Sequence, residues 1–412
     1  MSTSTSVRVP VGRVLALGGL SAFGPLAHDV YLPALPQLAT DLRVPEASAQ
    51  LTLSTCMVGM ALGQLLAGPV ADRVGRRWPL LVGVGLFAVT GVLCALAPSL
   101  EVLLAVRLLA GLAGGAGIVI TRAMVRDLYG GDAAARVFAL LMLVSGVAPI
   151  AGPVVGGLLL QVTDWRGVFF FLAAIGAVLF VAALTQGETL PAQRRRAGGL
   201  RVVAGVLRSV VRDRTFLLPA LVQGLAMCAM FTYIAMGSFV LQDPASVEGA
   251  LSPQVYAVVF GVNGLGILLA GRVSAWLVGR VGARRLLGAG VVIELVAAVA
   301  LLVGALTTRS VWALLPPLLV LVSCVGLVMP NATALALAGQ GDRAGTASAV
   351  LGLLQFTFAA IVPPLASLGG VTAAIMAVAI LGTAVAAAVV FLAVLHMRMP
   401  GSSVVDAAAD PA

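Results

Sequence analysis

One acidic residue, Asp29, lies within an apolar stretch that is long enough to cross a lipid bilayer. A run that breaks helices, Tyr31-Leu32-Pro33-Ala34-Leu35-Pro36, follows it almost at once. A charged side chain at mid-membrane costs roughly 2.5–3.5 kcal/mol on insertion scales, so such a residue is a functional candidate by default. It needs either a partner or a proton. The sequence offers one partner, Arg107, in the middle of another apolar stretch.

Asp29 and Arg107 together are suited to proton chemistry. Burial favours the neutral form of a carboxylic acid and a nearby arginine favours the charged form, so small movements can switch Asp29 between the two. We therefore predict that this pair couples proton binding to the movement of another solute; a static buried ion pair is the alternative. His28 is either a hydrogen-bonding neighbour of Asp29 or part of a proton relay. Glu294 is the third charged residue within the apolar stretches.

The composition places these charges in a membrane protein. Of the 412 residues, 60% are hydrophobic and 10% are charged, and the mean hydropathy is +1.10. A soluble protein would be about 25% charged. Apolar runs of about 20 residues, the length of a membrane-spanning helix, recur along the chain. We expect an all-α integral membrane protein with about twelve spans, near 13–35, 48–70, 78–97, 101–121, 136–161, 166–186, 215–241, 253–276, 286–306, 311–337, 345–368 and 371–395.

The net charge of +9 comes entirely from arginine, because the chain has no lysine. Most of these arginines fall in alternate loops, which is the positive-inside bias. It predicts a multi-pass protein of the cell (plasma or inner) membrane with both termini in the cytoplasm. The lipid bilayer explains the charge better than nucleic acid does. The four cysteines lie in apolar segments without paired spacing, so we expect core packing and neither disulfides nor a metal site.

The chain also contains an internal repeat. Arg73-Val74-Gly75-Arg76-Arg77 is similar to Arg280-Val281-Gly282-Ala283-Arg284, and each copy follows a long apolar segment. Two six-helix repeats joined by a linker are typical of secondary transporters, although simple duplication in a structural membrane protein is an alternative. We predict an N-terminal six-helix bundle (1–187), a cytoplasmic linker (188–214), a C-terminal six-helix bundle (215–398) and a polar cytoplasmic tail (399–412).

Glycine spacing predicts where helices approach closely. The pairs Gly59/Gly63, Gly111/Gly115 and Gly152/Gly156 are each four residues apart, which lets helix backbones pack together in lipid. The run Gly114-Gly115-Ala116-Gly117 lacks the lysine of a phosphate-binding loop and follows no strand, so it does not indicate nucleotide binding.

The loop from Gly68 to Arg77 resembles the signature of the major facilitator superfamily. Asp72 and the arginines can form a charge cluster at the cytoplasmic mouth, and the glycines allow a tight turn. The resemblance implies that this cluster latches one half of the protein to the other in the outward-facing state; topogenic charge alone is the alternative. The second copy has Gly279 in place of the acid. The residues predicted for the latch are Gly68, Asp72, Arg73, Gly75, Arg76, Arg77, Arg126 and Asp127.

Two further spans resemble elements of the same family. Arg107-Leu108-Leu109-Ala110-Gly111 is similar to a segment whose buried arginine is linked to proton transfer, although the family usually has glutamine where this chain has Ala110. The fifth span resembles the antiporter motif of exporters, in which proline bends a closely packed helix. General enrichment of membrane helices in glycine and proline is the alternative. The motif residues are Pro149, Gly152, Pro153, Gly156 and Gly157.

Together with Gly63-Gln64-Leu65, Arg126-Asp127-Leu128-Tyr129 and Asp164-Trp165-Arg166, these features resemble the drug:proton antiporters of the Bcr/CflA group. The resemblance implies a major facilitator fold and proton-coupled efflux of small amphipathic drugs or antibiotics by alternating access. It also implies that a proton gradient is the energy source and that no cofactor is needed. The implied partners are a small molecule and a proton. We expect the protein to work as a monomer.

A candidate substrate cavity follows from polar, methionine and aromatic residues on the spans. Met and aromatic side chains suit an adaptable drug pocket, although lipid contact or helix–helix hydrogen bonds explain them equally well. The candidate residues are Tyr31, Gln64, Gln223, Met227, Phe231, Tyr233 and Asn263.

Other functions fit the sequence less well. A proton-coupled transporter of a native metabolite stays open as an alternative. An integral-membrane enzyme such as a prenyl transferase would need clustered carboxylates, which the spaced acids here do not supply, so we expect no enzyme. A membrane sensor would need a soluble domain. The resemblance also puts the ninth span at the periphery, which favours a local packing role for Glu294.

Overall fold

The computed structural model describes residues 11–129, 137, 141, 151–195, 205, 208–340 and 344–397. Within these ranges the chain consists of α-helices and two short 3-10 helices, and the β structure there is an isolated bridge between Glu248 and Ser310. The predicted all-α fold class is confirmed. The chain forms two compact units. Unit 1 is Met1–Leu200 with Leu251–Gly264, and unit 2 is Arg201–Ala250 with Leu265–Ala412.

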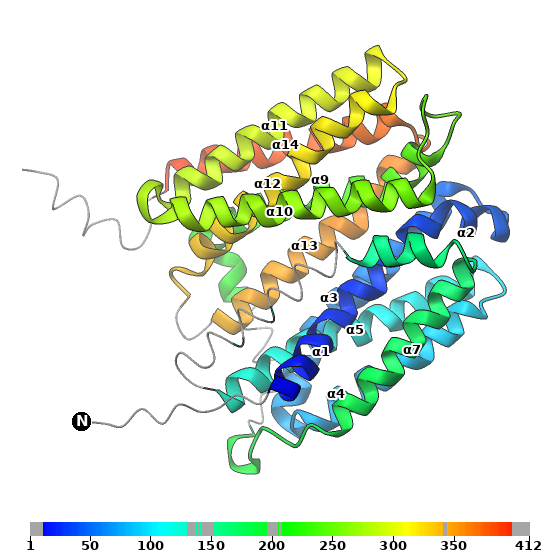
Figure 1. Cartoon of the computed structure of the whole chain (residues 1–412). Helices are drawn as coiled ribbons and strands as arrows, with labels where there is room; N and C mark the ends of the chain where they lie inside the picture. The colour runs from blue at the N-terminus through cyan, green and yellow to red at the C-terminus, as the bar shows by residue number, and fades with distance from the viewer. Residues whose placement is uncertain are drawn as a thin grey trace, which may run out of the picture. The chain divides into compact units, whose positions relative to one another are not determined.

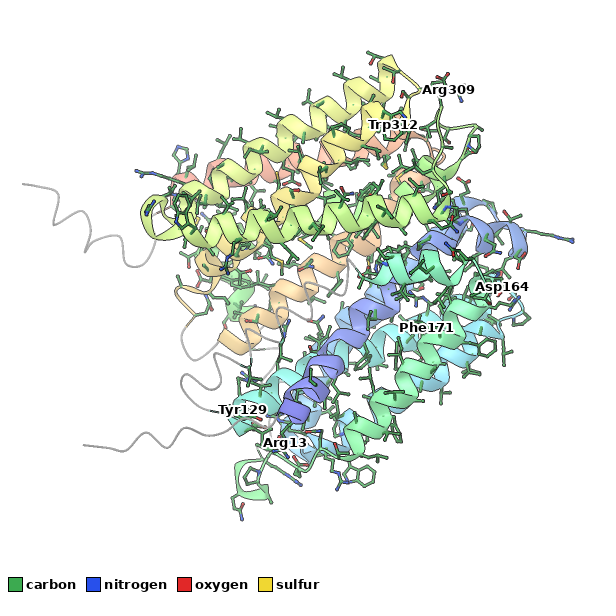
Figure 2. All side chains as sticks on the ribbon, viewed as in Figure 1. Arg13, Tyr129, Asp164, Phe171, Arg309 and Trp312 are labelled. Atoms are coloured by element: carbon green, nitrogen blue, oxygen red, sulfur yellow. The ribbon has the colours of Figure 1, made fainter. Side chains whose placement is uncertain are left out.

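The helices of unit 1 come mostly from the first half of the chain (Figure 1). They are α1 (Val11–Asp29), η1 (Leu32–Ala34), α2 (Leu35–Leu42), α3 (Glu46–Val74), α4 (Arg77–Ala95), α5 (Leu100–Leu128), the helical segment 151–159, α7 (Trp165–Leu184) and η2 (Ala192–Arg194). α5 packs against α1, α3 and α4, and α4 also packs against α7. In Figure 2, Arg13 and Tyr129 lie at one end of this unit and Asp164 lies at the opposite end.

Unit 2 is built from the later helices, drawn in green, yellow and orange-red in Figure 1. They are α9 (Arg214–Gln242), α10 (Pro253–Val281), α11 (Ala283–Thr307), α12 (Val311–Leu337), α13 (Ala344–Ser367) and α14 (Ala373–Leu395). The first residues of α10, up to Gly264, group with unit 1. α9 packs against α12, α13 and α14, and α11 packs against α12 and α14. The predicted bundle boundaries stay a prediction, and the predicted tail 399–412 lies outside the described residues.

The described helices confirm a multi-pass membrane protein. Ten of them, counted within the described ranges, are long and apolar enough to cross a membrane. The predicted first span corresponds to α1 followed by η1. The predicted fifth span, near 136–161, is described only at residues 137, 141 and 151–161.

Two of the predicted glycine pairs bring α3 and α5 into close contact. A methyl group at Gly59 or Gly63 would overlap the backbone of α5, and one at Gly111 or Gly115 would overlap the backbone of α3. The close approach predicted from their spacing is therefore confirmed for these two helices. This contact fixes α5, which carries Arg107, against the helix that carries the signature loop.

The repeated motif adopts the same turn in both copies. α3 and α10 are each 29 residues long, and each is followed directly by a glycine with positive φ. The φ angle is 104° at Gly75 and 85° at Gly282. Glycine adopts this conformation without the steric penalty that a Cβ would bring. The two copies therefore share local structure as well as sequence.

Candidate functional site

Asp29 is the last residue of α1. The helix stops here because Pro33, just beyond, has no backbone N–H with which to continue it, and the chain turns into η1. Asp29 is only 5% exposed, and its Oδ1 lies 2.9 Å from Nδ1 of His28. An acid and an imidazole are thus in contact at the buried end of a helix.

Arg107, on α5, is 1% exposed and reaches the same helix end. Its Nη1 donates to the carbonyl oxygen of Ala27 at 2.8 Å, and its Nε donates to that of Thr52 at 3.3 Å. The last carbonyls of a helix lack a partner within the helix. The guanidinium of Arg107 therefore caps α1 beside Asp29. Among the described residues, its Nη2 has no hydrogen-bond partner.

Two aromatic rings complete the surroundings of Arg107. Its guanidinium carbon lies 4.3 Å from the ring centre of Tyr31 and 5.7 Å from that of Phe169. The hydroxyl of Tyr31 lies 3.1 Å from Oγ1 of Thr52. Cation–π contacts of this kind are worth about 2 kcal/mol or more where water is excluded. Thr52 and Phe169 are site residues that the sequence motifs did not point to, since both contribute through tertiary contact.

A static ion pair between Asp29 and Arg107, the alternative to proton coupling, is not found among the described side chains. Asp29 is paired with His28, and Arg107 bonds to backbone carbonyls instead. The cause is the end of α1, which offers an unpaired carbonyl to Arg107 only two residues before Asp29. The thiol of Cys56 lies close enough to interact electrostatically with both side chains. The two residues thus share one site without touching.

The glycines of the antiporter-like segment lie against Asp29. A methyl group at Gly152 would sit 2.9 Å from Cβ of Asp29, and one at Gly156 would overlap the carbonyl oxygen of Val30. One at Gly157 would sit 2.8 Å from Cβ of Ala257, at the start of α10. The close helix approach predicted for Gly152 and Gly156 is confirmed, and its partner is the end of α1. Pro153 is buried in the same segment, and Pro149 lies outside the described residues.

Three of the predicted latch residues form a charge cluster: Asp72, Arg76 and Asp127. Nη1 of Arg76 lies 2.5 Å from Oδ1 of Asp72, and Nε of Arg76 lies 3.0 Å from Oδ2 of Asp127. Arg76 is 6% exposed. Its guanidinium is therefore held between one carboxylate at the end of α3 and another at the end of α5.

The other predicted latch residues lie around this charge cluster. Gly75 makes the turn between α3 and α4. Gly68 lies inside α3, where a methyl group would meet only ordinary contacts, so it takes no part in the turn. Arg73, Arg77 and Arg126 have exposed side chains.

Glu188 is a member of this region that the motifs missed. Its carboxylate accepts hydrogen bonds from the backbone N–H of Arg76 (2.8 Å) and Arg77 (3.4 Å) at the start of α4, and from those of Thr189 (3.0 Å) and Leu190 (2.9 Å). Partial burial works to raise the pKa of Glu188, but these four donors outweigh it and hold the pKa below its ordinary value. An acid directly after the sixth span, in an arginine-rich stretch, is the signal that could have identified it.

The seven residues of the predicted substrate cavity are all buried. Tyr31 belongs to the site of Asp29 and Arg107, as described above. Gln223 uses its Oε1 to accept a hydrogen bond from Thr333 at 2.8 Å. Phe231 packs against Phe356, with ring centres 6.1 Å apart. The remaining four are Gln64, Met227, Tyr233 and Asn263.

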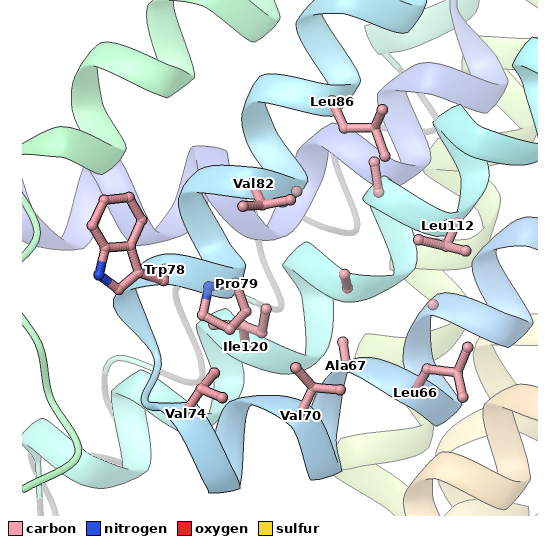
Figure 3. A pocket seen from close by; sticks show the side chains of 14 residues that line it. Leu66, Ala67, Val70, Val74, Trp78, Pro79, Val82, Leu86, Leu112 and Ile120 are labelled. Atoms are coloured by element: carbon pink, nitrogen blue, oxygen red, sulfur yellow. The ribbon is translucent and has the colours of Figure 1, made fainter. Parts of the chain in front are cut away.

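A cavity of about 390 Å³ lies elsewhere in unit 1, among α3, α4 and α5 (Figure 3). Its wall residues are all apolar, and none is a predicted substrate-cavity residue. Several of them are exposed, including Trp78 and Val82. A cavity of this kind has no polar group with which to orient a polar cargo.

Comparison with known proteins gives the family. A model of the Major Facilitator Superfamily matches residues 17–364. A Bacillus subtilis protein, the uncharacterized MFS-type transporter YdgK, is 36% identical over 394 residues, which cover 94% of this chain and 96% of the relative. The bicyclomycin resistance protein homolog of Haemophilus influenzae is 28% identical over 84% of this chain and 87% of the relative. Among solved structures, the nucleoside transporter NupG has the same fold, with a TM-score of 0.74 at 15% identity over 92% of this chain and 99% of that chain.

Proposed function

Because the chain belongs to the Major Facilitator Superfamily and is a transporter rather than an enzyme, we propose that it exports small amphipathic drugs or antibiotics in exchange for protons. The proton gradient is the energy source, and the two halves of the protein alternate in access to the two sides of the membrane. The cell inner membrane or plasma membrane, with both chain termini in the cytoplasm, is the proposed location.

The observation that carries the proposal is the surroundings of Asp29. Its carboxyl is buried at a helix end, in contact with the imidazole of His28, and the antiporter-like segment packs directly on it through Gly152. An intramembrane acid that touches the segment whose motif is typical of exporters is suited to link proton binding with a change in helix packing.

The cycle depends on how Asp29 responds to its surroundings. On the outward side, a proton binds the carboxylate and helps to release the drug. On the inward side, the proton leaves and a new drug molecule binds. Arg107 supplies the positive charge that favours the ionised acid. Its Nη2, which has no partner among the described residues, gives it a free donor with which to follow a shift at the end of α1.

The nature of the cargo rests on the relatives and on the chemistry of the candidate cavity. A relative is named as a bicyclomycin resistance protein homolog, which supports a drug as cargo and placement in the Bcr/CflA group. Met227, Phe231 and Tyr233 on α9 are polarizable or aromatic side chains, and all three are buried in this structure. Side chains of this kind adapt to apolar molecules of varied shape.

We assign the charge cluster of Asp72, Arg76 and Asp127 to the cytoplasmic latch. The guanidinium of Arg76 is buried, so separating it from both carboxylates would leave an uncompensated charge, which favours two distinct states of this contact. Glu188, in the predicted linker, extends this charge cluster, because its carboxylate accepts a hydrogen bond from the backbone N–H of Arg76. The latch would close in the outward-facing state and open during the return.

Drug susceptibility of cells with and without the gene tests the proposal. Expression is expected to raise the inhibitory concentration of several amphipathic antibiotics, and collapse of the proton gradient is expected to abolish the effect. The variant Asp29→Asn is expected to abolish it at a normal protein level. A matched control is Glu101→Gln, an exposed acid in the first turn of α5, which should keep full resistance. Resistance that persists without a proton gradient would contradict the proposal.

A further inference from the structure

Glu294 lies near the middle of α11, with its side chain on the buried face. α11 runs from Ala283 to Thr307, so Glu294 is the twelfth of its 25 residues. Glu294 itself is only 2% exposed. It shares its face with apolar residues at helical spacing, namely Leu287, Gly290, Val291, Ala297, Ala298 and Leu301. The acid is therefore inside unit 2, not on a lipid-facing surface.

The neighbours of Glu294 are apolar side chains and two thiols. Val291, one turn earlier on α11, belongs to a core cluster that also contains Ala226 of α9 and Val328 of α12. Cys228 of α9 and Cys324 of α12 lie close enough to interact electrostatically with the carboxyl. Both are buried free cysteines. A thiol is only a weak hydrogen-bond donor, so neither can compensate a full negative charge.

Among the residues that the structure describes, no cation faces Glu294 from the helices packed around it. α14, from Ala373 to Leu395, contains no titratable side chain. The titratable group of α12 is Cys324, and α9 places Cys228 close enough to interact electrostatically with Glu294. Accordingly, both carboxyl oxygens of Glu294 lack a hydrogen-bond partner among the described residues. A carboxylate without a partner in such a place is so unfavourable that the group takes up a proton instead.

We propose that Glu294 is a second proton-binding site of this protein, a carboxylic acid that keeps its proton at neutral pH inside the bundle of α9, α11, α12 and α14. It is separate from Asp29, which lies in unit 1 and contacts an imidazole. A proton suits this site because, unlike a metal ion, it needs no set of ligands around it. The bound proton is a property of unit 2 itself and does not depend on the cargo or on the coupling role of Asp29.

Infrared difference spectroscopy on the purified full-length protein in lipid tests this directly. The spectrum of the variant Glu294→Gln is subtracted from that of the wild type at neutral pH, because glutamine keeps the side-chain length and removes only the acid. The expected difference is the C=O stretching band of a protonated carboxylic acid, which shifts in D2O. Carboxylate stretching bands in its place would overturn the proposal. The exposed control Glu101→Gln should show those carboxylate bands.

A second measurement separates this role from that of a paired charge. Glu294→Gln and Glu294→Leu are both expected to unfold at the wild-type temperature or above, because an acid without a partner contributes no bond that they would lose. A lower unfolding temperature in both would reveal a stabilising partner of the carboxylate and overturn the proposal. Either variant serves for the infrared subtraction if the other does not accumulate as folded protein.

Discussion

The contact between the antiporter-like segment and Asp29 gives a sharp mutational prediction. A Cβ at Gly152 would lie 2.9 Å from Cβ of Asp29 and 3.3 Å from the backbone nitrogen of Val30. Carbon atoms in good contact are about 3.5–4.0 Å apart, so Gly152→Ala must push the end of α1 away by roughly half an ångström or more. At Gly156 the added carbon would overlap the carbonyl oxygen of Val30 and require a larger shift.

The magnitude follows from two opposing effects. Overpacking of this kind costs about 1–3 kcal/mol, and alanine gains about 1 kcal/mol over glycine inside a helix. The net cost is therefore about 0–2 kcal/mol for Gly152→Ala and near the upper end for Gly156→Ala. Gly382 on α14 is a matched control, because nothing lies within 4 Å of a Cβ built there. Gly382→Ala should raise stability by about 0.5–1 kcal/mol.

Thermal unfolding in detergent and drug efflux from cells, measured on the same variants, test this reasoning. We expect the order of stability Gly382→Ala, wild type, Gly152→Ala, Gly156→Ala. We also expect Gly152→Ala to lose efflux out of proportion to its small loss of stability, because it displaces Asp29 itself. If Gly156→Ala is as stable and as active as Gly382→Ala, the segment does not pack on the end of α1 and the argument fails.

Three further predictions concern other charged groups of the two units. Arg107→Lys keeps the charge but lacks the planar guanidinium that bonds to two carbonyls. The loss of one hydrogen bond to a charged group corresponds to a loss of efflux of about tenfold or more, which we expect at an unchanged protein level. Because the pKa of Glu188 is lowered, its stabilising effect is present above its unfolded-state pKa, about 4.3, and is lost as the pH falls through the folded-state value. A plot of unfolding temperature against pH should therefore be flatter for Glu188→Gln than for the wild type in this acid range. Identical plots would refute the linker contact. A hydrogen bond from the hydroxyl of Thr215 lowers the pKa of Asp213; partial burial opposes this shift and Gln340 adds to it. The carboxylate also caps the start of α9. Asp213→Ala should therefore lower the free energy of unfolding, measured by chemical denaturation, by about 0.5–2 kcal/mol.

Much of the fold could be predicted because membrane spans and close helix contacts follow from local sequence. Spans such as α11 are recognisable in the sequence as long apolar runs. The four-residue spacing of Gly111 and Gly115 is by itself enough to predict a helix contact. The turn at Gly75 was recognisable because positive φ favours glycine. These features depend on residues that are neighbours along the chain.

The partners at the site could not be predicted, because they depend on where helices end and meet. Arg107 bonds to Ala27, 80 positions away in the sequence, because α1 stops there and leaves a carbonyl unpaired. Glu188 reaches the backbone of Arg76 from 112 positions away. The interior position of Glu294 has the same origin, since only the packing of α9, α12 and α14 decides which face of α11 is buried.

The most direct test of the central claim is the movement of protons and drug by purified protein in liposomes. With an imposed pH difference, we predict that a drug accumulates against its gradient while protons move in the opposite direction, and that Asp29→Asn abolishes both while Glu101→Gln retains both. Uphill accumulation in the absence of any pH difference or membrane voltage, or full coupling in Asp29→Asn, would contradict the account.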